Sequence, residues 1–285
     1  MARGEHELPP TNEWLTPGEA DSLFGLRFTK RRVEYLLRRW VCKNAVAAAS
    51  ALPVDLASLG RIELLHHPSG APHVHVDGAP LGVEISTTDR AGWAVCLVGE
   101  DLTRVGCDVE IVEPRSEAFV ADFFTRDEQA YVASLTATDR DATANLIWSA
   151  KESALKVLQT GLRRDTRSVE VIIEPTSTGG AGAQAGSGWA RLEVRTAEGT
   201  CLPGWWRRNG VFLVTVASER PLDPPTALAG STDLDTARPV HSWLRRPLSL
   251  QTRRQALPVS LLSLRRVPCP VRARRRGTAA ARPPE

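Results

Sequence analysis

The chain has 285 residues, of which 42% are hydrophobic and 24% charged, fractions typical of a soluble globular protein. No apolar run reaches the ~18–20 residues that a membrane helix needs, and the N-terminal residues lack the apolar region of a secretory signal. The five cysteines form no C-x-x-C pair, which argues against a zinc ribbon or a disulfide framework and favours a reducing cytoplasm.

Charge is distributed unevenly along the chain. Residues 221–285 contain twelve arginines, four acidic residues and no lysine, a net charge of +8, together with ten of the twenty prolines. We therefore expect a disordered basic tail over 221–285 after a mildly acidic folded body. Such a tail could contact phosphates of nucleic acid or membrane, or be an extension without a role. We expect neither partner, because no interleaved aromatic and glycine pattern supports RNA recognition.

The first half of the body alternates helix and strand patterns. Thr16, Pro17 and Glu19 form a capping box that predicts a short helix. Residues 30–49 carry apolar side chains at helical spacing and predict a basic amphipathic helix. Strand patterns follow at 61–65, 73–76, 93–98 and 104–112. A Gly-Glu-Asp turn predicts that the last two of these strands form a hairpin.

The second half repeats this order. Thr125 and Glu128 form another capping box, which predicts a helix to about Leu135, and a longer helix is expected over 141–158. Strands are predicted at 168–173, 189–195 and 210–217. Helix followed by strands, twice over, predicts an α+β fold of two similar lobes. We divide the chain into an N-terminal lobe (1–112), a C-terminal lobe (113–220) and the tail (221–285).

Two further patterns carry weaker signals. Residues 180–185 read G-x-G-x-x-A, but a strand follows where a dinucleotide site needs a helix, so we expect a hairpin loop. Four histidines cluster in the first half. A metal site there is conceivable, but no cysteine or suitably spaced carboxylate completes it, which favours a surface cluster. These histidines are His66, His67, His73 and His75.

A pair of carboxylates marks the strand pattern VGCDVEIV. Asp108 and Glu110 lie two residues apart, so both point to one face of the strand while Cys107 and Val109 point to the other. Converging carboxylates suit Mg²⁺, which prefers oxygen ligands. A solvated strand face is the ordinary alternative for a D-x-E pattern taken alone.

A second cluster lies in the long predicted helix, where residues 148–156 read WSAKESALK. Glu152 and Lys156 are four residues apart and share a face, with Trp148 one turn earlier. A surface ion pair is the alternative. However, the chain has four lysines among 36 basic residues, and two of them fall in this stretch. This bias favours a function, such as an ammonium group that approaches a phosphate oxygen.

Taken together, VGCDVE at 105–110, FFTRDE at 123–128 and WSAKESALK at 148–156 resemble the motifs of 4′-phosphopantetheinyl transferases of the large, pseudo-dimeric, surfactin-synthetase-activating type. The resemblance covers about residues 15–220. It implies a pseudo-dimeric fold and the transfer of 4′-phosphopantetheine from coenzyme A to a serine of an apo acyl or peptidyl carrier protein. Such carriers serve polyketide, nonribosomal peptide or fatty acid synthesis, and the reaction releases 3′,5′-ADP.

The resemblance also implies roles for individual residues. Asp108, Glu110 and Glu152 would hold Mg²⁺ on the pyrophosphate of coenzyme A. Glu152 would also act as general base on the carrier serine, and Lys156 would stabilise charge on the phosphate. Metal and lysine together supply the charge neutralisation that phosphoryl-type transfer needs. The residues expected to contact coenzyme A are Arg39, Lys43, Thr88, Asp89, Arg90 and Lys156.

Two positions depart from the pattern of the family. Asp89 stands where a phosphate-contacting histidine is expected, and Ala71 stands where a lysine is expected. A catalytically impaired relative that binds carrier protein or coenzyme A is therefore the alternative to an active enzyme. We expect a cytoplasmic monomer, since one chain supplies both lobes.

Overall fold

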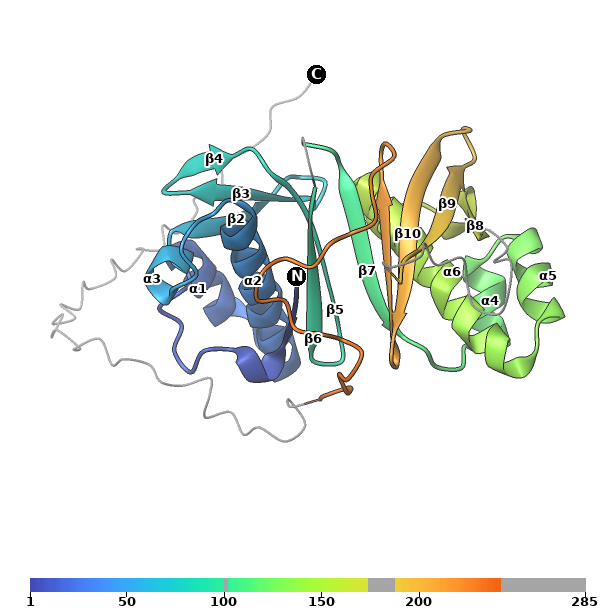
Figure 1. Cartoon of the computed structure of the whole chain (residues 1–285), viewed down its shortest axis with the longest axis horizontal. Coiled ribbons are helices and arrows are strands. Elements are labelled where there is room, and N and C mark those ends of the chain that lie inside the picture. The colour runs from blue at the N-terminus through green and yellow to red at the C-terminus, as the bar shows by residue number, and fades with distance from the viewer. Residues whose placement is uncertain (100–101, 174–187, 242–285) are drawn as a thin grey trace, which may run out of the picture. The chain divides into compact units, whose positions relative to one another are not determined.

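The computed structural model describes residues 1–99, 102–173 and 188–241 (Figure 1). The glycine-rich segment 180–185 and residues 242–285 of the predicted tail lie outside these ranges. The elements up to residue 99 are β1 (Ala2–Gly4), α1 (Pro17–Gly25), α2 (Thr29–Ala49), α3 (Leu56–Leu59), β2 (Ile62–His66), β3 (Pro72–Val76), β4 (Ala79–Leu81), β5 (Glu84–Arg90) and β6 (Trp93–Gly99). Those that follow are β7 (Val105–Ile111), α4 (Glu117–Phe123), α5 (Arg126–Ser134), α6 (Ala137–Val157), β8 (Val169–Ile173), β9 (Ala190–Thr196), β10 (Cys201–Asn209) and β11 (Phe212–Ser218). Short 3-10 turns lie at Glu5–Glu7, Gly161–Arg163 and Thr166–Ser168.

Within the described residues the strands form three antiparallel sheets. Their strand orders are β1-β6-β5, β2-β3-β4 and β7-β11-β10-β9-β8. The predicted hairpin between residues 93–98 and 104–112 is wrong. β6 pairs instead with β5 through a turn at Ala91 and Gly92, whose φ angles of 47° and 80° lie in the left-handed region. β5, with the sequence EISTTDR, escaped prediction because it lacks alternating apolar residues.

β7 belongs to the five-stranded sheet, where it pairs with β11 from Val105 opposite Ser218 to Ile111 opposite Phe212. The predicted lobe boundary at residue 112 assigned this strand to the N-terminal half. The register corrects that assignment, because the partner strand comes from more than a hundred residues downstream. The strand that carries Asp108 and Glu110 is therefore the first element of the C-terminal sheet.

Three hydrophobic clusters hold the described residues together. Helix α6 packs on one face of the five-stranded sheet, and α2 packs against β6, β5 and β2, as Figure 1 shows. The third cluster joins β1 and β6 to β7, β10 and β11 through Trp93, Cys107, Val109, Trp205 and Phe212. Helix, sheet, sheet and helix thus form successive layers. The expectation of an α+β fold is confirmed.

A buried ion pair joins each capping box to its long helix. In the first half the ammonium of Lys43 on α2 lies 2.6 Å from Glu19, the glutamate of the Thr16 capping box. It also donates to the carbonyl oxygens of Trp14 and Leu59 at 2.8 and 3.1 Å. Lys43 has no exposed surface, so these three acceptors satisfy every proton of its ammonium.

The second half contains the same arrangement. Lys151 on α6 lies 2.8 Å from Glu128 of the Thr125 capping box and donates to the carbonyl oxygens of Thr166 and Val169. Each glutamate also accepts from the backbone of the strand that follows its lysine: Glu19 from Leu64 N–H, and Glu128 from Val171 N–H. This shared set of contacts supports the predicted similarity of the two halves.

The first part of the predicted tail is packed against the body, which corrects the boundary at residue 220. Between residues 221 and 241 the side chains of Leu234 and Ala237 are buried. Trp205 donates its indole N–H to Leu222 O, and Trp93 donates to Arg238 O at 2.7 Å. Residues 221–241 form neither helix nor strand, but indole donors and a hydrophobic surface order the segment. None of the helices in the described ranges is both long and apolar enough to cross a membrane.

We expect Lys151→Met to lower the free energy of unfolding by roughly 3–5 kcal/mol, because Glu128 would remain buried without its counter-charge. Urea unfolding at pH 7 measures this change. Lys30→Met is the matched control, since more than half of the Lys30 side chain is exposed and an exposed pair contributes less than about 1 kcal/mol. Equal free energies of unfolding for the two variants would show that the buried ion pair of Lys151 does not stabilise the fold.

Removal of residues 221–285 should lower the unfolding free energy by about 2 kcal/mol, since it exposes the surface under Leu234 and leaves two indole N–H groups without their acceptors. Thermal unfolding measures the change. A chain that ends at His241 keeps the segment 221–241 and is the control. Identical melting temperatures for the two truncated chains would show that this segment adds no stability.

Candidate functional site

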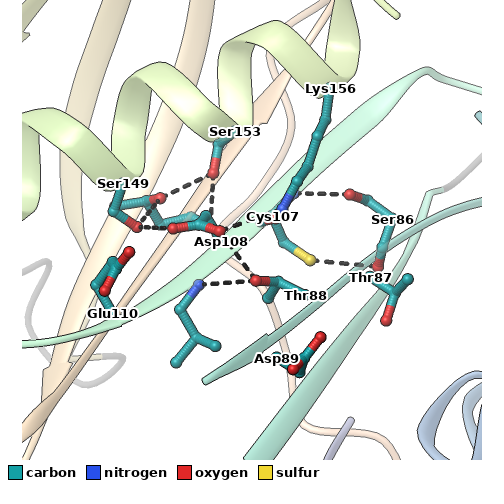
Figure 2. A network of polar contacts seen from close by, with 12 residues as sticks. Ser86, Thr87, Thr88, Asp89, Cys107, Asp108, Glu110, Ser149, Ser153 and Lys156 are labelled. Atoms are coloured by element: carbon teal, nitrogen blue, oxygen red, sulfur yellow. Dashed lines mark hydrogen bonds and ion pairs between the residues drawn. The ribbon is translucent and has the colours of Figure 1, made fainter. Parts of the chain in front are cut away.

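The site lies where α6 crosses β7. A Cβ atom at Gly106 would lie 1.9 Å from the carbonyl oxygen of Ser153, so only glycine allows the strand and the helix to approach this closely. The approach places one face of α6, with Ser149, Glu152 and Lys156, against the carboxylate face of β7. Figure 2 shows Ser149, Ser153 and Lys156 projecting from the helix toward Asp108 on the strand.

Asp108 accepts hydrogen bonds from three side chains. The hydroxyl of Thr88 on β5 and the ammonium of Lys156 donate to Oδ1 at 2.9 and 3.2 Å. The hydroxyl of Ser149 donates to Oδ2 at 2.9 Å. The predicted alternation along the strand is confirmed, because Cys107 and Val109 lie on the opposite face, within the core between the sheets. Asp108 is therefore held at once by the N-terminal half, through Thr88, and by α6.

Glu110 is held by one aromatic and two basic side chains. Trp148 donates its indole N–H to Oε1 at 3.1 Å, and the guanidinium groups of Arg90 and Arg115 each approach Oε2 to 3.1 Å. Burial, followed by the charge of Asp108, raises the pKa of Glu110, and the two arginines oppose that shift. Although these cations lie nearby, Oε2 accepts no well-aligned hydrogen bond from any described residue.

Glu152 is the most perturbed carboxyl group of the site. Burial is the largest cause, and the negative charge of Asp108 the next, of a shift that raises its pKa to about 7. Its Oε1 is buried and has no hydrogen-bond partner in the described parts of the chain. A carboxylate in this position lacks the compensation that buried charges normally have.

Lys156 is the cation that forms an ion pair with Asp108. Its ammonium donates to Cys107 O at 2.7 Å and lies 3.2 Å from Asp108, and 29% of its side-chain surface is exposed. Burial acts to lower the pKa of Lys156, but the charge of Asp108 and the neighbouring acidic groups outweigh it, so the pKa is raised. Lys156 thus remains a cation and has a path to solvent.

The donor set fits a divalent cation in its chemistry. Three carboxyl groups with hard oxygen ligands gather here. Among the described residues, Oε1 of Glu152 has no hydrogen-bond partner, and Oε2 of Glu110 has two arginines nearby but no well-aligned hydrogen bond. A cation between the carboxyl groups would remove the like-charge repulsion. In the part of the chain that the structure describes, no three histidine, cysteine or acidic side chains converge closely enough to form a finished metal centre. The carboxyl groups would have to converge further to share one ion.

A cavity of about 190 Å³ lies beside this cluster, between the N-terminal part of α2, the β5–β6 turn and the end of β7. Asp89 and Arg90 line it, as do Lys30 and Glu113. Asp89 forms an ion pair with Arg38 at 2.5 Å, and Arg90 bridges Glu110 and Glu113. A larger depression of about 440 Å³ elsewhere on the surface contains none of the three carboxylates.

The structure does not bring all the predicted residues to this cavity. Lys43 is enclosed in the first buried ion pair, which contradicts its predicted contact with coenzyme A. Arg39 is also buried: its guanidinium covers the Tyr35 ring at 3.6 Å and lies 3.6 Å from Glu19. Thr88 is buried and contacts Asp108, so it supports the carboxylate cluster and does not line the cavity.

Three of the four clustered histidines stack their rings beside or on β3. The rings of His67 and His73 have centroids 4.2 Å apart, and those of His73 and His75 are 5.3 Å apart. Because His73 and His75 lie two residues apart in β3, the alternation of a strand already placed them on one face. The described residues contain no group of three metal-ligating side chains that includes these histidines.

The sequence did not identify Thr215 and Arg115 as residues of the site. It also did not show that the hydroxyl of Ser149 donates to Asp108. Ser149 lies one turn before Ser153 on α6, so helical spacing could have grouped them. Thr215 and Arg115 gave no signal, because a single threonine in a strand and a single arginine in a loop are ordinary surface residues. The position of Thr215 follows from the pairing of β7 with β11, which sets it opposite Asp108. Arg115 lies in the loop between β7 and α4, from which it reaches Glu110.

Comparison with known proteins identifies a related segment. The profile of the 4′-phosphopantetheinyl transferase superfamily matches residues 104–196, from the start of β7 to the end of β9. A holo-[acyl-carrier-protein] synthase from Enterococcus faecalis (strain ATCC 700802 / V583) is 40% identical over 60 residues, which are 21% of this chain and 50% of that protein. The chain thus spans half the length of this relative.

In metal-free buffer we expect Glu152→Gln to stabilise the fold at pH 8. A folded-state pKa of about 7, above the ordinary 4.5, means that stability is fully present below pH 4.5 and is lost as the pH rises through 7. A neutral amide avoids this loss, so the variant should gain roughly 1–3 kcal/mol at pH 8 and little at pH 4.5. Chemical unfolding with EDTA at both pH values measures the gain. Glu193→Gln, a partly exposed glutamate on β9, is the control. A gain that does not depend on pH would contradict this origin.

Proposed function

We propose that the protein is a 4′-phosphopantetheinyl transferase that moves the phosphopantetheine group of coenzyme A to a serine of an apo acyl or peptidyl carrier protein. The observation that carries the proposal is the cluster of Asp108, Glu110, Glu152 and Lys156, which the contact of β7 with α6 assembles inside the segment that matches the superfamily. The synthase from Enterococcus faecalis supports carrier proteins as the acceptors by its name.

Asp108, Glu110 and Glu152 would hold Mg²⁺. When bound, the ion would neutralise phosphate charge and polarise the oxygens of the pyrophosphate. The buried Oε1 of Glu152 favours this assignment, since it has no hydrogen-bond donor among the described residues. Oε2 of Glu110 faces two arginines without a well-aligned hydrogen bond. Trp148 and Arg115 keep Glu110 turned toward the cluster.

Glu152 and Lys156 would carry the proton and charge changes of the transfer. Glu152 would take the proton of the carrier serine, either directly or through a water molecule, and its high pKa is suited to a base that works near neutral pH. Lys156 would donate to the phosphate as the bond to 3′,5′-ADP breaks. Its ammonium already lies at the edge of the cluster and is partly exposed.

The phosphates of coenzyme A would enter through the cavity beside Arg90. Arg90 lines that cavity and also reaches Glu110, so it connects the ligand with the carboxylate cluster. Lys30 on α2 supplies a second cation in the lining. Asp89, the departure from the family pattern, pairs with Arg38, which cancels its charge and holds that guanidinium near the cavity. We therefore retain Asp89 and Arg90 as proposed contacts of coenzyme A.

The proposed type of transferase follows from the similarity of the two halves. The repeated Lys–Glu pairs favour the pseudo-dimeric type of transferase, in which one chain contains two similar lobes and acts as a cytoplasmic monomer. An impaired relative that binds carrier protein or coenzyme A without efficient transfer is the second candidate, favoured by Asp89 and Ala71. The two candidates differ in whether the carrier becomes covalently modified.

The test is to incubate the protein with coenzyme A, Mg²⁺ and an apo carrier protein, and to follow attachment of phosphopantetheine by intact-protein mass spectrometry. We expect modification by the unaltered chain. Glu152→Gln and Asp108→Asn should each slow it at least ~10²-fold, because they remove a charge from the reacting cluster. Glu193→Gln, on the outer surface of β9, should react at the unaltered rate.

Failure of the unaltered chain to modify any carrier, while it still binds coenzyme A, would favour the impaired relative. Modification by Glu152→Gln at a normal rate would instead remove Glu152 from the mechanism. In both cases circular dichroism should confirm that the variants are folded.

A further inference from the structure

Behind Asp108 lies a chain of three hydroxyl groups that makes no contact with the cavity. Ser149 and Ser153 project from α6, and Thr215 projects from β11, the strand that pairs with β7. All three residues are completely buried. The hydroxyl of Thr215 lies 2.8 Å from each of the two serine hydroxyls, so it connects them. Figure 2 shows the serines along the helix above the carboxylate.

The three hydroxyl groups can donate their protons in one arrangement only. A carboxylate can only accept, so Ser149 gives its single proton to Oδ2 of Asp108. The oxygen of Ser149 must then accept from Thr215. Thr215 has no proton left for Ser153, which therefore donates to the hydroxyl and the carbonyl oxygens of Thr215. Each hydroxyl thus donates toward the carboxylate, and the bonds strengthen one another.

The other oxygen of Asp108 is fixed from the opposite side. Thr88 on β5 donates to Oδ1 and accepts from Val109 N–H at 3.4 Å, which fixes the direction of its proton as well. With Thr88 and Lys156 on Oδ1 and Ser149 on Oδ2, rotation of the carboxyl group would break at least one bond. One lone pair of Oδ2 stays without a donor among the described residues.

We propose that the chain Ser153–Thr215–Ser149 positions Asp108 for a divalent cation, by holding its carboxyl plane so that the open lone pair of Oδ2 is presented to the carboxylate cluster. Ser149 and Thr215 are positioning residues in this proposal and touch neither substrate nor metal. The inference rests on the proposed function in so far as that function assigns a cation to Asp108. Hydrogen-bonded partners of this kind typically contribute 10- to 100-fold to the affinity for a metal.

The test measures Mn²⁺ binding by the electron paramagnetic resonance signal of the free ion, with the full chain and without coenzyme A or carrier protein. Ser149→Ala should weaken Mn²⁺ binding by about 10- to 100-fold and Thr215→Val by about tenfold, because each removes one hydroxyl group from the hydrogen-bonded series that holds Asp108. Thr215→Ser keeps the hydroxyl and should restore binding to near the unaltered value.

Thr196→Val is the matched control. Thr196 is a buried threonine of the same sheet, on β9, and its hydroxyl accepts from Thr200 N–H at 3.1 Å. It should lose stability as Thr215→Val does, yet bind Mn²⁺ as the unaltered chain does. In the transfer assay the Thr215→Val enzyme should show a lower kcat with an unchanged KM for the carrier protein.

Three results would overturn the inference. Unaltered affinity in both Ser149→Ala and Thr215→Val would show that the chain does not position Asp108, while the proposed function would stand. Equal weakening by Thr196→Val would assign the effect to packing. Absence of Mn²⁺ binding by the unaltered chain would reject the cation itself, and with it the metal-dependent part of the proposed function.

Discussion

The buried ion pair between Lys151 and Glu128 is the interaction on which the geometry of the site depends. Both groups are almost completely removed from water, so the pair is maintained only because each partner also has backbone hydrogen bonds. It joins α6 to the α5 capping box and to β8. Because successive residues of a helix are rotated by roughly 100°, turning Lys151 into the core turns Glu152 toward β7. The Lys151–Glu128 ion pair therefore determines which face of α6 lies against the carboxylates of β7.

The first half of the chain contains an equivalent buried ion pair, but it lacks the acidic and basic residues that would match Glu152 and Lys156. Alignment of Lys43 with Lys151 places Asn44 at the position of Glu152 and Ala48 at the position of Lys156. Asn44 donates to Trp40 O within α2, which is an ordinary contact inside a helix. The two halves thus share the interaction that orients the long helix, while the acidic and basic groups are present in one half. The first half contributes two side chains of β5 to the site: Thr88, which donates to Asp108, and Arg90, which pairs with Glu110.

The edge of β7 explains how the halves meet at this point. Ser86 and Thr88 on β5 use their hydroxyl oxygens to accept the backbone N–H groups of Cys107 and Val109. These donors would otherwise remain unpaired inside the protein, at a cost comparable to a lost hydrogen bond. The hydroxyl of Thr88 then has its proton free for Asp108. One side chain consequently joins the two sheets and orients the carboxylate.

Much of the local structure followed from the sequence alone, because its causes act over a few residues. The capping boxes at Thr16 and Thr125 located two helices, and the alternation of β7 placed Asp108 and Glu110 on one face. The spacing of Glu152 and Lys156 placed them together on α6. Tertiary structure decided the rest. β7 pairs with β11 and not with its neighbour β6, since strand pairing depends on residues far apart in the chain.

The same reason explains the basic residues that were assigned wrongly. A lysine on an amphipathic helix has the same local pattern whether it faces solvent or a buried glutamate, and only the position of Glu19 decided that Lys43 lies in the core. Likewise, composition predicted a tail from residue 221, but the indole groups of Trp93 and Trp205 provided partners that hold its first part. The sequence alone determined which residues carry charge and on which face of each element they lie. Tertiary contacts determined which of those charges are buried in ion pairs and which face the site, because burial and pairing depend on groups that other segments bring near.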